Sequence, residues 1–294
     1  SEILDIIDRF INAAVIAKET GFTGVQLHSA HGYLLSEFLS PNINQRSDEW
    51  GGSLQNRARL LLETISGIRS KVGIDYPISV KLNSSDFQKG GFSHEESLEV
   101  AKMLDQSSLD LLEISGGTYE NFTALDIGSM NLKESRTIKP SRSTVVREAY
   151  FLKYASEIKE HISLPLAVTG GFRSTDGMNK ALETNACDLI GLGRPLCSEP
   201  DLVNNLLSGH KSSAILYENI LELGPWILGL NSPFKMIKSN NRVAQVYWCY
   251  RQILEIAAKK DVDPKISLIS ALINHFRDDA KLSKKYKKYW QDLN

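Results

Sequence analysis

Apolar residues follow two alternating spacings along most of the chain. Between residues 3 and 17 they return every three or four positions, which predicts an amphipathic helix that begins after Ser1 as an N-cap and ends near Gly21. Short apolar runs without a helical period predict strands at 24–28, 77–82, 109–115, 165–169 and 188–192. Helical spacing predicts helices at 56–72, 93–104, 145–161 and 175–184, with a longer loop over 116–142 and a last helix after Glu199.

Strands that alternate with helices indicate parallel βαβ units, so the expected fold class is α/β. A doubly wound sheet and a barrel both fit this alternation. From about residue 216 the pattern changes to helical, aromatic-rich sequence without strands. We therefore interpret residues 1–215 as one α/β domain and residues 216–294 as a helical C-terminal extension that packs on it.

Composition and charge narrow the class of protein. The 294 residues include 34 basic and 35 acidic side chains, for a formal net charge of −1, and lack the broad basic footprint of a nucleic-acid-binding protein. The lysines near the C-terminus are interpreted as a solvated helix face. Cys187, Cys197 and Cys249 fit neither a disulfide framework nor a metal knuckle, which favours a reducing compartment. Because the sequence has no membrane-spanning stretch and no signal-peptide pattern, we expect a cytoplasmic protein.

Glycine pairs follow the last two predicted strands. The first loop contains Gly170, Gly171 and Phe172, and the second contains Gly193 and Arg194. Backbone N–H groups of such loops commonly bind a phosphate after the last strands of a (β/α)₈ barrel, and an arginine adds a charge-assisted hydrogen bond. The alternative is two ordinary tight turns between a strand and a helix. Two such loops on consecutive strands favour the phosphate site.

The end of the first predicted strand carries the strongest local signal. His28 and His31 lie three positions apart, and Tyr33 follows two positions later. Two imidazoles can donate hydrogen bonds to a substrate oxygen where negative charge develops, and a tyrosine hydroxyl can deliver a proton. A zinc site is the weaker interpretation, because no third ligand lies at usable spacing, so no metal is expected.

The histidine pair opens a longer run of distinctive residues. It reads His28-x-x-His31-Gly32-Tyr33-Leu34 and continues as Phe38-Leu39-Ser40-Pro41 and Asn44-Gln45-Arg46-x-Asp48-x-Trp50-Gly51-Gly52-Ser53-x-x-Asn56-Arg57. Further segments are Val80-Lys81-Leu82-Asn83-Ser84, Gly90-Gly91-Phe92, Glu113-Ile114-Ser115-Gly116-Gly117 and the two glycine loops. Together these segments resemble the Old Yellow Enzyme family, and the resemblance fades after about residue 215.

The resemblance implies an FMN-binding (β/α)₈ barrel, the TIM barrel, with NADH or NADPH as reductant. In that family His28 and His31 would hold the carbonyl oxygen of an activated alkene over the flavin. Tyr33 would protonate the alkene carbon opposite to hydride delivery from flavin N5. Lys81 would place positive charge near flavin N1 and O2, at a position where family members often have arginine.

The FMN phosphate, by the same resemblance, would be held by the two glycine loops. Its expected ligands are Gly170, Gly171, Phe172, Gly193 and Arg194. Four residues of the long signature are instead expected to fix the loop after the histidine strand, and they are Arg46, Asp48, Asn56 and Arg57.

Two departures from the family refine this interpretation. Relatives that act on dienoyl-CoA carry a cysteine cluster for an iron–sulfur centre, whereas only Cys197 and Cys249 follow the last strand here. Those relatives also tend to lack the first histidine, which His28 supplies. The family places its histidine pair on the fourth barrel strand, so this chain would represent strands 4–8, without the first three βα units. Three explanations of that difference are open. The chain is a fragment of a longer protein, it is completed by a partner segment, or it is a degraded pseudoenzyme.

The expected function is therefore that of an FMN-dependent NAD(P)H oxidoreductase that reduces enones and enoates. The alternative is a truncated, catalytically inert barrel fragment or pseudoenzyme. The expected partners are a small-molecule alkene and, in a homo-oligomer, further copies of the chain. Neither nucleic acid nor membrane is an expected partner.

Overall fold

The computed structural model describes residues 2–116, 151–258 and 260–292. Its internal contacts group residues 1–172 and 176–191 into a first unit, and residues 173–175 and 192–294 into a second unit. Ser1, most of the loop expected at 116–142 and the start of the helix expected at 145–161 lie outside the described residues.

The first unit alternates helices with strands in the predicted order. Five parallel strands lie side by side in chain order, β1-β2-β3-β4-β5. The strands are β1 (Val25–Ser29), β2 (Ile78–Asn83), β3 (Leu111–Ser115), β4 (Leu166–Thr169) and β5 (Leu189–Gly191). The helices are α1 (Glu2–Glu19), α2 (Leu34–Leu39), α3 (Leu54–Val72), α4 (His94–Asp105), α7 (Leu152–Lys159) and α8 (Thr175–Glu183). The α/β class and the parallel βαβ units are confirmed.

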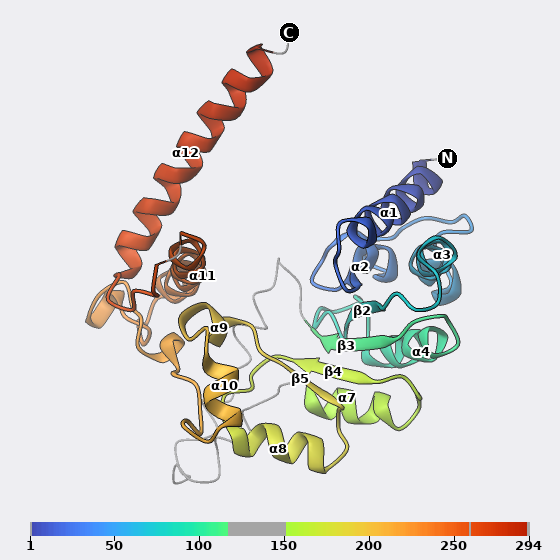
Figure 1. The fold of residues 1–294 in the computed structure, drawn as a ribbon, viewed down its shortest axis with the longest axis horizontal. Coiled ribbons are helices and arrows are strands. Elements are labelled where there is room, and N and C mark those ends of the chain that lie inside the picture. The colour runs from blue at the N-terminus through green and yellow to red at the C-terminus, as the bar shows by residue number, and fades with distance from the viewer. Residues whose placement is uncertain (1, 117–150, 259, 293–294) are drawn as a thin grey trace. The chain divides into compact units, whose positions relative to one another are not determined.

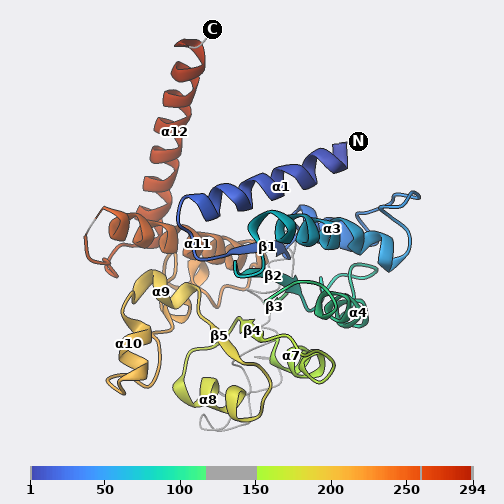
Figure 2. The same ribbon diagram turned by 45° about the vertical axis from the view of Figure 1, so that its right-hand side comes forward.

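The two faces of the sheet differ in chemistry. One face is covered by α3, α4, α7 and α8 (Figures 1 and 2) and presents apolar side chains such as Val80 and Ile114, which are fully buried. The opposite face carries polar side chains at paired positions, since His28 pairs with Lys81 and Lys81 with Glu113. Paired residues of a parallel sheet point to the same side, so these three side chains share one face. The sheet thus has an apolar layer under the helices and a polar inner face.

Local sequence explains where the helices begin and how closely they pack. Ser93 and Glu96 form a reciprocal capping box at the start of α4, which satisfies two backbone donors of its first turn. Helices α1 and α3 pack tightly at Gly67, where a Cβ atom would lie 2.4 Å from Ile11 Cδ1. Each fully buried leucine or isoleucine in this layer contributes about 1.5–3 kcal/mol to stability.

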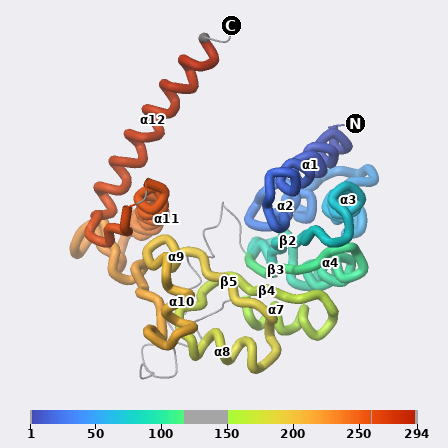
Figure 3. The backbone as a smooth tube through the Cα atoms, in the orientation of Figure 1, coloured from blue at the N-terminus to red at the C-terminus, as the bar shows by residue number. Residues whose placement is uncertain are grey.

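The second unit is helical. Its elements are α9 (Arg194–Ser198), α10 (Leu202–Leu207), the short 3₁₀ helices η1 (Tyr217–Asn219) and η2 (Trp226–Leu228), α11 (Lys235–Ala257) and α12 (Leu268–Asp292). Helices α11 and α12 pack together around Trp248, and α12 continues as a straight helix beyond that contact (Figure 3). The prediction that residues 216–294 form an extension that packs on the barrel stays a prediction.

Candidate active site

Strand β1 ends at the histidine pair. His28 lies within β1, and His31 and Gly32 follow it in left-handed backbone conformations, with φ of 64° and 80°. Two consecutive left-handed residues turn the chain sharply, and glycine adopts this conformation without strain whereas histidine does not. Ser36 stabilises the turn, since its hydroxyl accepts from Gly32 N at 3.0 Å and donates to Tyr33 O at 2.8 Å.

The turn brings the three aromatic side chains together. The rings of His28 and His31 lie 5.1 Å apart between centroids and are perpendicular. The ring of Tyr33 lies 4.5 Å from that of His28, and its side chain is 41% exposed at the start of α2. The His31 ring is held from a second strand, because its Nε2 lies 2.8 Å from Ser115 Oγ. The structure therefore brings together the three residues that the sequence singled out as catalytic.

Both imidazoles are held neutral. Burial, then the neighbouring His28 and the charge of Lys81, together lower the pKa of His31 to about 4, while Glu113 opposes the shift. Burial is also the largest cause that lowers the pKa of His28, followed by Lys81, while Glu113 opposes the shift. A neutral imidazole has one N–H donor and one acceptor nitrogen. At neutral pH the pair can thus donate hydrogen bonds without adding positive charge.

Lys81 lies beside the histidines on the inner face. Its Nζ forms an ion pair with Glu113 Oε1 at 3.0 Å, and Gln26 Nε2 donates to the other carboxylate oxygen at 2.8 Å. Burial alone would raise the pKa of Glu113, but hydrogen bonds from Thr169 and Gln26 and the charge of Lys81 lower it. Glu113 is therefore a carboxylate that holds the Lys81 ammonium at the centre of the polar face.

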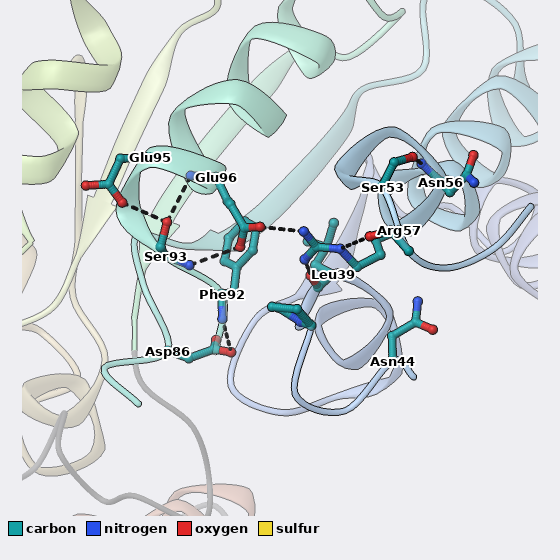
Figure 4. A network of polar contacts seen from close by, with 12 residues as sticks. Leu39, Asn44, Ser53, Asn56, Arg57, Asp86, Phe92, Ser93, Glu95 and Glu96 are labelled. Atoms are coloured by element: carbon teal, nitrogen blue, oxygen red, sulfur yellow. Dashed lines mark hydrogen bonds and ion pairs between the residues drawn. The ribbon is translucent and has the colours of Figure 1, made fainter. Parts of the chain in front are cut away.

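Polar contacts also link the turn to β2 and link α2 to α3 and α4, and Figure 4 shows those around Arg57. Arg57, 5% exposed, donates to the carbonyls of Gly52 and Leu39 and pairs with Glu96 at the start of α4. Asp86 accepts from Phe92 N at 3.0 Å and from Asn83 Nδ2 at 2.9 Å, and Asn83 Oδ1 accepts from His31 N at 3.2 Å. Arg57 thus joins α2, α3 and α4, and Asn83 ties the histidine turn to β2.

The other signature residues lie in the loop before α3. Arg46 pairs with Asp48, whose carboxylate also accepts from Trp50 N at 3.1 Å. Asn56 follows the Ser53 N-cap, and its backbone N–H donates to the Ser53 hydroxyl at 3.3 Å. These contacts lie within the loop and the first turn of α3. They agree with the expectation that Arg46, Asp48 and Asn56 fix this loop.

The glycine loops leave neighbouring strands at the same edge of the sheet, because β4 and β5 are parallel partners. Gly170 and Gly171 follow β4 with φ of 138° and 87°, a conformation that favours glycine. Phe172 is 1% exposed and its side chain is buried, so Phe172 can contact a ligand only through its backbone. Gly193 and Arg194 belong to the second unit, at the N-terminus of α9.

Sequence reasoning assigned no role to three residues of the site. They are Asn83, Glu113 and Ser115, which contact His31 or Lys81 from β2 and β3. All three lie in the strand segments that carried the family resemblance. A polar residue at every second position of a buried strand, toward its C-terminal end, is the signal that points to them.

The part of the chain that the structure describes contains neither a cluster of metal ligands nor a membrane-spanning helix. No group of three histidine, cysteine or acidic side chains is placed there to hold a metal ion. None of the helices in residues 2–116, 151–258 and 260–292 combines the length and apolar character needed to cross a bilayer.

Comparison with known proteins gives one consistent result. Residues 1–212 match the model of the NADH:flavin oxidoreductase / NADH oxidase family. An NADH-dependent flavin oxidoreductase, nadA, of Aspergillus parasiticus is 39% identical over 217 residues, which are 74% of this chain and 46% of that protein. This chain thus spans about half the length of that curated relative.

Two solved structures are similar to the same region. A 2-naphthoyl-CoA reductase in complex with 2-naphthoyl-CoA matches with a TM-score of 0.61 and 34% identity, over 71% of this chain and 29% of that one. An Old Yellow Enzyme homologue from Zymomonas mobilis matches with a TM-score of 0.56 and 25% identity, over 74% of this chain and 55% of that one. The five-stranded sheet is therefore part of a barrel of the Old Yellow Enzyme type.

Proposed function

The chain belongs to the NADH:flavin oxidoreductase / NADH oxidase family, and we propose that it reduces electron-poor alkenes, such as enones and enoates, at the His28–His31–Tyr33 cluster. FMN and NADH are the cofactor and reductant of the family, in agreement with the expectation from the sequence. The observation that carries the proposal is a pair of neutral imidazoles packed beside a half-exposed tyrosine at the end of a parallel strand.

The residues present fit a flavin. Among the described residues, His28 Nδ1 is buried and has no hydrogen-bond partner, and a bound polar group would satisfy it. Lys81 supplies positive charge on the same face, and the left-handed Gly170 and Gly171 suit a close approach of backbone to phosphate. When bound, FMN would accept a hydride from NADH and deliver it to the alkene.

The side chains then have distinct roles. His28 and His31 donate hydrogen bonds to the carbonyl oxygen of the substrate and stabilise the negative charge that develops there. The Tyr33 hydroxyl delivers a proton to the alkene carbon that does not receive the hydride. Lys81 would stabilise the negative charge of the reduced flavin, and the FMN phosphate would be held by Gly170, Gly171, Phe172, Gly193 and Arg194.

The substrate class follows from what neutral imidazoles recognise. A hydrogen-bonded carbonyl conjugated to a carbon–carbon double bond withdraws electrons and prepares the distant carbon for hydride attack. The 2-naphthoyl-CoA reductase described above is bound to 2-naphthoyl-CoA, in which a carbonyl group is conjugated to an aromatic ring. We therefore assign an unsaturated carbonyl compound as the substrate class.

Replacement of Tyr33 by phenylalanine tests the proton donor. The purified chain is first loaded with FMN, and a shifted flavin absorption band that survives desalting reports binding. With 2-cyclohexenone as the probe, Tyr33→Phe should slow alkene reduction by about 10²-fold or more. Flavin reduction by NADH, followed by the loss of the same band, should stay within about twofold, because that half-reaction needs no proton from Tyr33.

The two half-reactions separate the possible outcomes. Equal loss of both rates in Tyr33→Phe would contradict the role of Tyr33 as proton donor. A chain that retains no FMN on desalting would instead support the inert alternative for this polypeptide. Tyr289→Phe is the matched control. Tyr289 is an exposed residue of α12, far in sequence from Tyr33, and its replacement should change neither rate.

A further inference from the structure

Helix α12 extends beyond its contact with α11 (Figure 3). Leu268 and Ala271, in its first turns, are each 1% exposed, and together with the partly buried Leu272 they pack in the cluster around Trp248. The last turns differ, because every residue from 280 to 291 is exposed. We refer to residues 280–291 as the α12 tail.

The apolar side of α12 continues into the tail. An α-helix completes about five turns in 18 residues, so Tyr286 and Trp290 lie on the same side as Leu268 and Leu272. Leu282 lies on this side too, one turn before Tyr286. These three residues form a stripe within an arc of about 80°. Leu282, Tyr286 and Trp290 are 54%, 64% and 61% exposed, and an exposed apolar stripe over successive turns marks an interaction surface.

The remainder of the tail is basic. Its sequence has no acidic residue and five lysines, which are Lys281, Lys284, Lys285, Lys287 and Lys288. The tail therefore carries five positive charges, although the whole chain has a formal net charge of −1. On a regular helix each of these lysines lies about 100° or more from the centre of the stripe. Lys281 pairs with Asp278 at 3.7 Å and is still 75% exposed, so its charge stays accessible.

This combination of side chains suits the boundary between a bilayer and water. Tyrosine and tryptophan have an apolar ring with a polar group, and both are enriched at that boundary. Lysine can keep its ammonium group among the headgroups while its methylene chain lies along apolar surface. A helix with an apolar aromatic side and a lysine-rich side lies flat in the interface, and anionic lipids strengthen its binding.

Two other occupants match the tail less well. A second copy of the tail would bring five lysines close to five more, and like charges repel. Single-stranded nucleic acid binds in grooves where basic and aromatic side chains face the same strand. In the tail, by contrast, the lysines point away from the apolar stripe.

We propose that the α12 tail binds the surface of membranes that contain anionic lipids. Leu282, Tyr286 and Trp290 insert among the headgroups, and the lysines contact the lipid phosphates. The lysines alone predicted a solvated helix face, and the structure adds the exposed stripe beside them. The sequence predicted no membrane partner because it has no spanning stretch, but a helix that lies on a membrane needs none.

The experiment is sedimentation of the full chain with vesicles at pH 7 and low salt. Vesicles of phosphatidylcholine with about 30% phosphatidylglycerol should bind the chain about 10²-fold more tightly than vesicles of phosphatidylcholine alone. Salt at about 0.5 M should release most of the bound chain, because it screens the lysine charges. Equal binding to both vesicles, or binding to neither, would overturn the proposal. So would binding of a single-stranded oligonucleotide in place of the vesicles.

Removal of charge tests the lysines. The triple variant Lys284→Gln, Lys285→Gln and Lys287→Gln should bind the anionic vesicles about 10²-fold more weakly, from about fivefold for each lysine. The matched control changes three exposed lysines outside the tail, by Lys71→Gln, Lys180→Gln and Lys235→Gln. It has the same net charge as the test variant and should bind like wild type. Equal losses in the two variants would contradict a site on the tail.

Trp290 reports the insertion of the stripe. Its fluorescence should shift to shorter wavelength when anionic vesicles are added, because the ring leaves water. Trp290→Phe should bind the vesicles within about threefold of wild type but lack this shift, since phenylalanine keeps an apolar ring. A shift that persists in Trp290→Phe would contradict insertion of the stripe. The vesicle comparison with the wild-type chain decides the question if a variant fails to fold. No residue of the flavin site enters these tests, so they stand apart from those of the proposed function.

Discussion

His31 combines three constraints in one residue. Its backbone is left-handed with φ of 64°, its Nε2 contacts Ser115, and its ring is buried enough to lower the pKa to about 4. The left-handed backbone strains the folded chain, and burial penalises the protonated form of the imidazole. A residue held in this way has a preset orientation when a ligand arrives, and preorganised hydrogen-bond donors are the most effective kind.

The lowered pKa of His31 makes stability depend on pH. The ordinary pKa of 6.5 describes the unfolded chain, and the folded value is about 4. Between these values the unfolded chain binds a proton that the folded chain does not. The contribution of neutral His31 is therefore complete above pH 6.5 and is lost as the pH falls toward 4. After allowance for solvent screening, the effect amounts to about 2 kcal/mol.

Asparagine at this position isolates the titration. It tolerates the left-handed backbone and has no titratable group. The free energy of unfolding is measured with urea at pH 7 and at pH 4.5. Between these two pH values it should fall by about 2 kcal/mol more in wild type than in His31→Asn. Loss of the contact with Ser115 lowers the stability of the variant equally at both pH values. Parallel pH dependences of the two proteins would show that His31 is not buried in the neutral form.

The sequence revealed His28, His31 and Tyr33 because they lie within one short stretch, where spacing alone places them together. Their partners Asn83 and Ser115 come from other strands, and their contacts depend on the register of β1, β2 and β3. Periodicity predicts that a strand exists but does not fix which residues pair across it. The polar surroundings of the site therefore became visible only in the folded chain.

Arg57 acts at the scale of whole elements, because its buried guanidinium extends from α3 and contacts both α2 and α4. Arg57→Met would leave Glu96 and the carbonyl of Leu39 without this donor. Removal of one partner of a buried ion pair costs about 3–5 kcal/mol. We expect this loss in the free energy of unfolding, measured with urea. Arg9→Met is the matched control, since Arg9 is 77% exposed and its pair with Asp5 contributes less than about 1 kcal/mol. Equal effects of the two substitutions would refute the bridging role.

Element length decided which parts of the fold the sequence could predict. The long helices α1 and α3 were predicted because their apolar residues repeat with a helical period over many positions. All five strands were predicted because each is a short apolar run without that period. The short α2 (Leu34–Leu39) and α9 (Arg194–Ser198) were not predicted. Each has fewer than two turns, too few for a helical period to be recognised, and both follow a turn that tertiary contacts hold in place.

At the scale of the whole chain, the two units have different kinds of core. The first buries aliphatic side chains between a sheet and its helices, and the second packs α11 and α12 around Trp248. The Trp248 ring is 1% exposed, and its Nε1 donates to Ile266 O at 2.9 Å. The family match ends at residue 212, so most of this packing lies beyond the matched region.

Trp248→Ala should therefore destabilise the second unit selectively. Truncation of a buried tryptophan costs about 3–5 kcal/mol, through lost apolar contacts and the cavity that remains. Hydrogen exchange followed by mass spectrometry should show faster exchange for amides of α11 and α12, while those of β1, β2 and β3 keep their wild-type rates. Trp226→Ala is the matched control, because Trp226 is 91% exposed, and it should leave both sets of rates unchanged. If Trp248→Ala accelerates exchange in β1–β3 as much as in α11 and α12, the two cores unfold as one cooperative body, and the division of the chain into two units does not describe its stability.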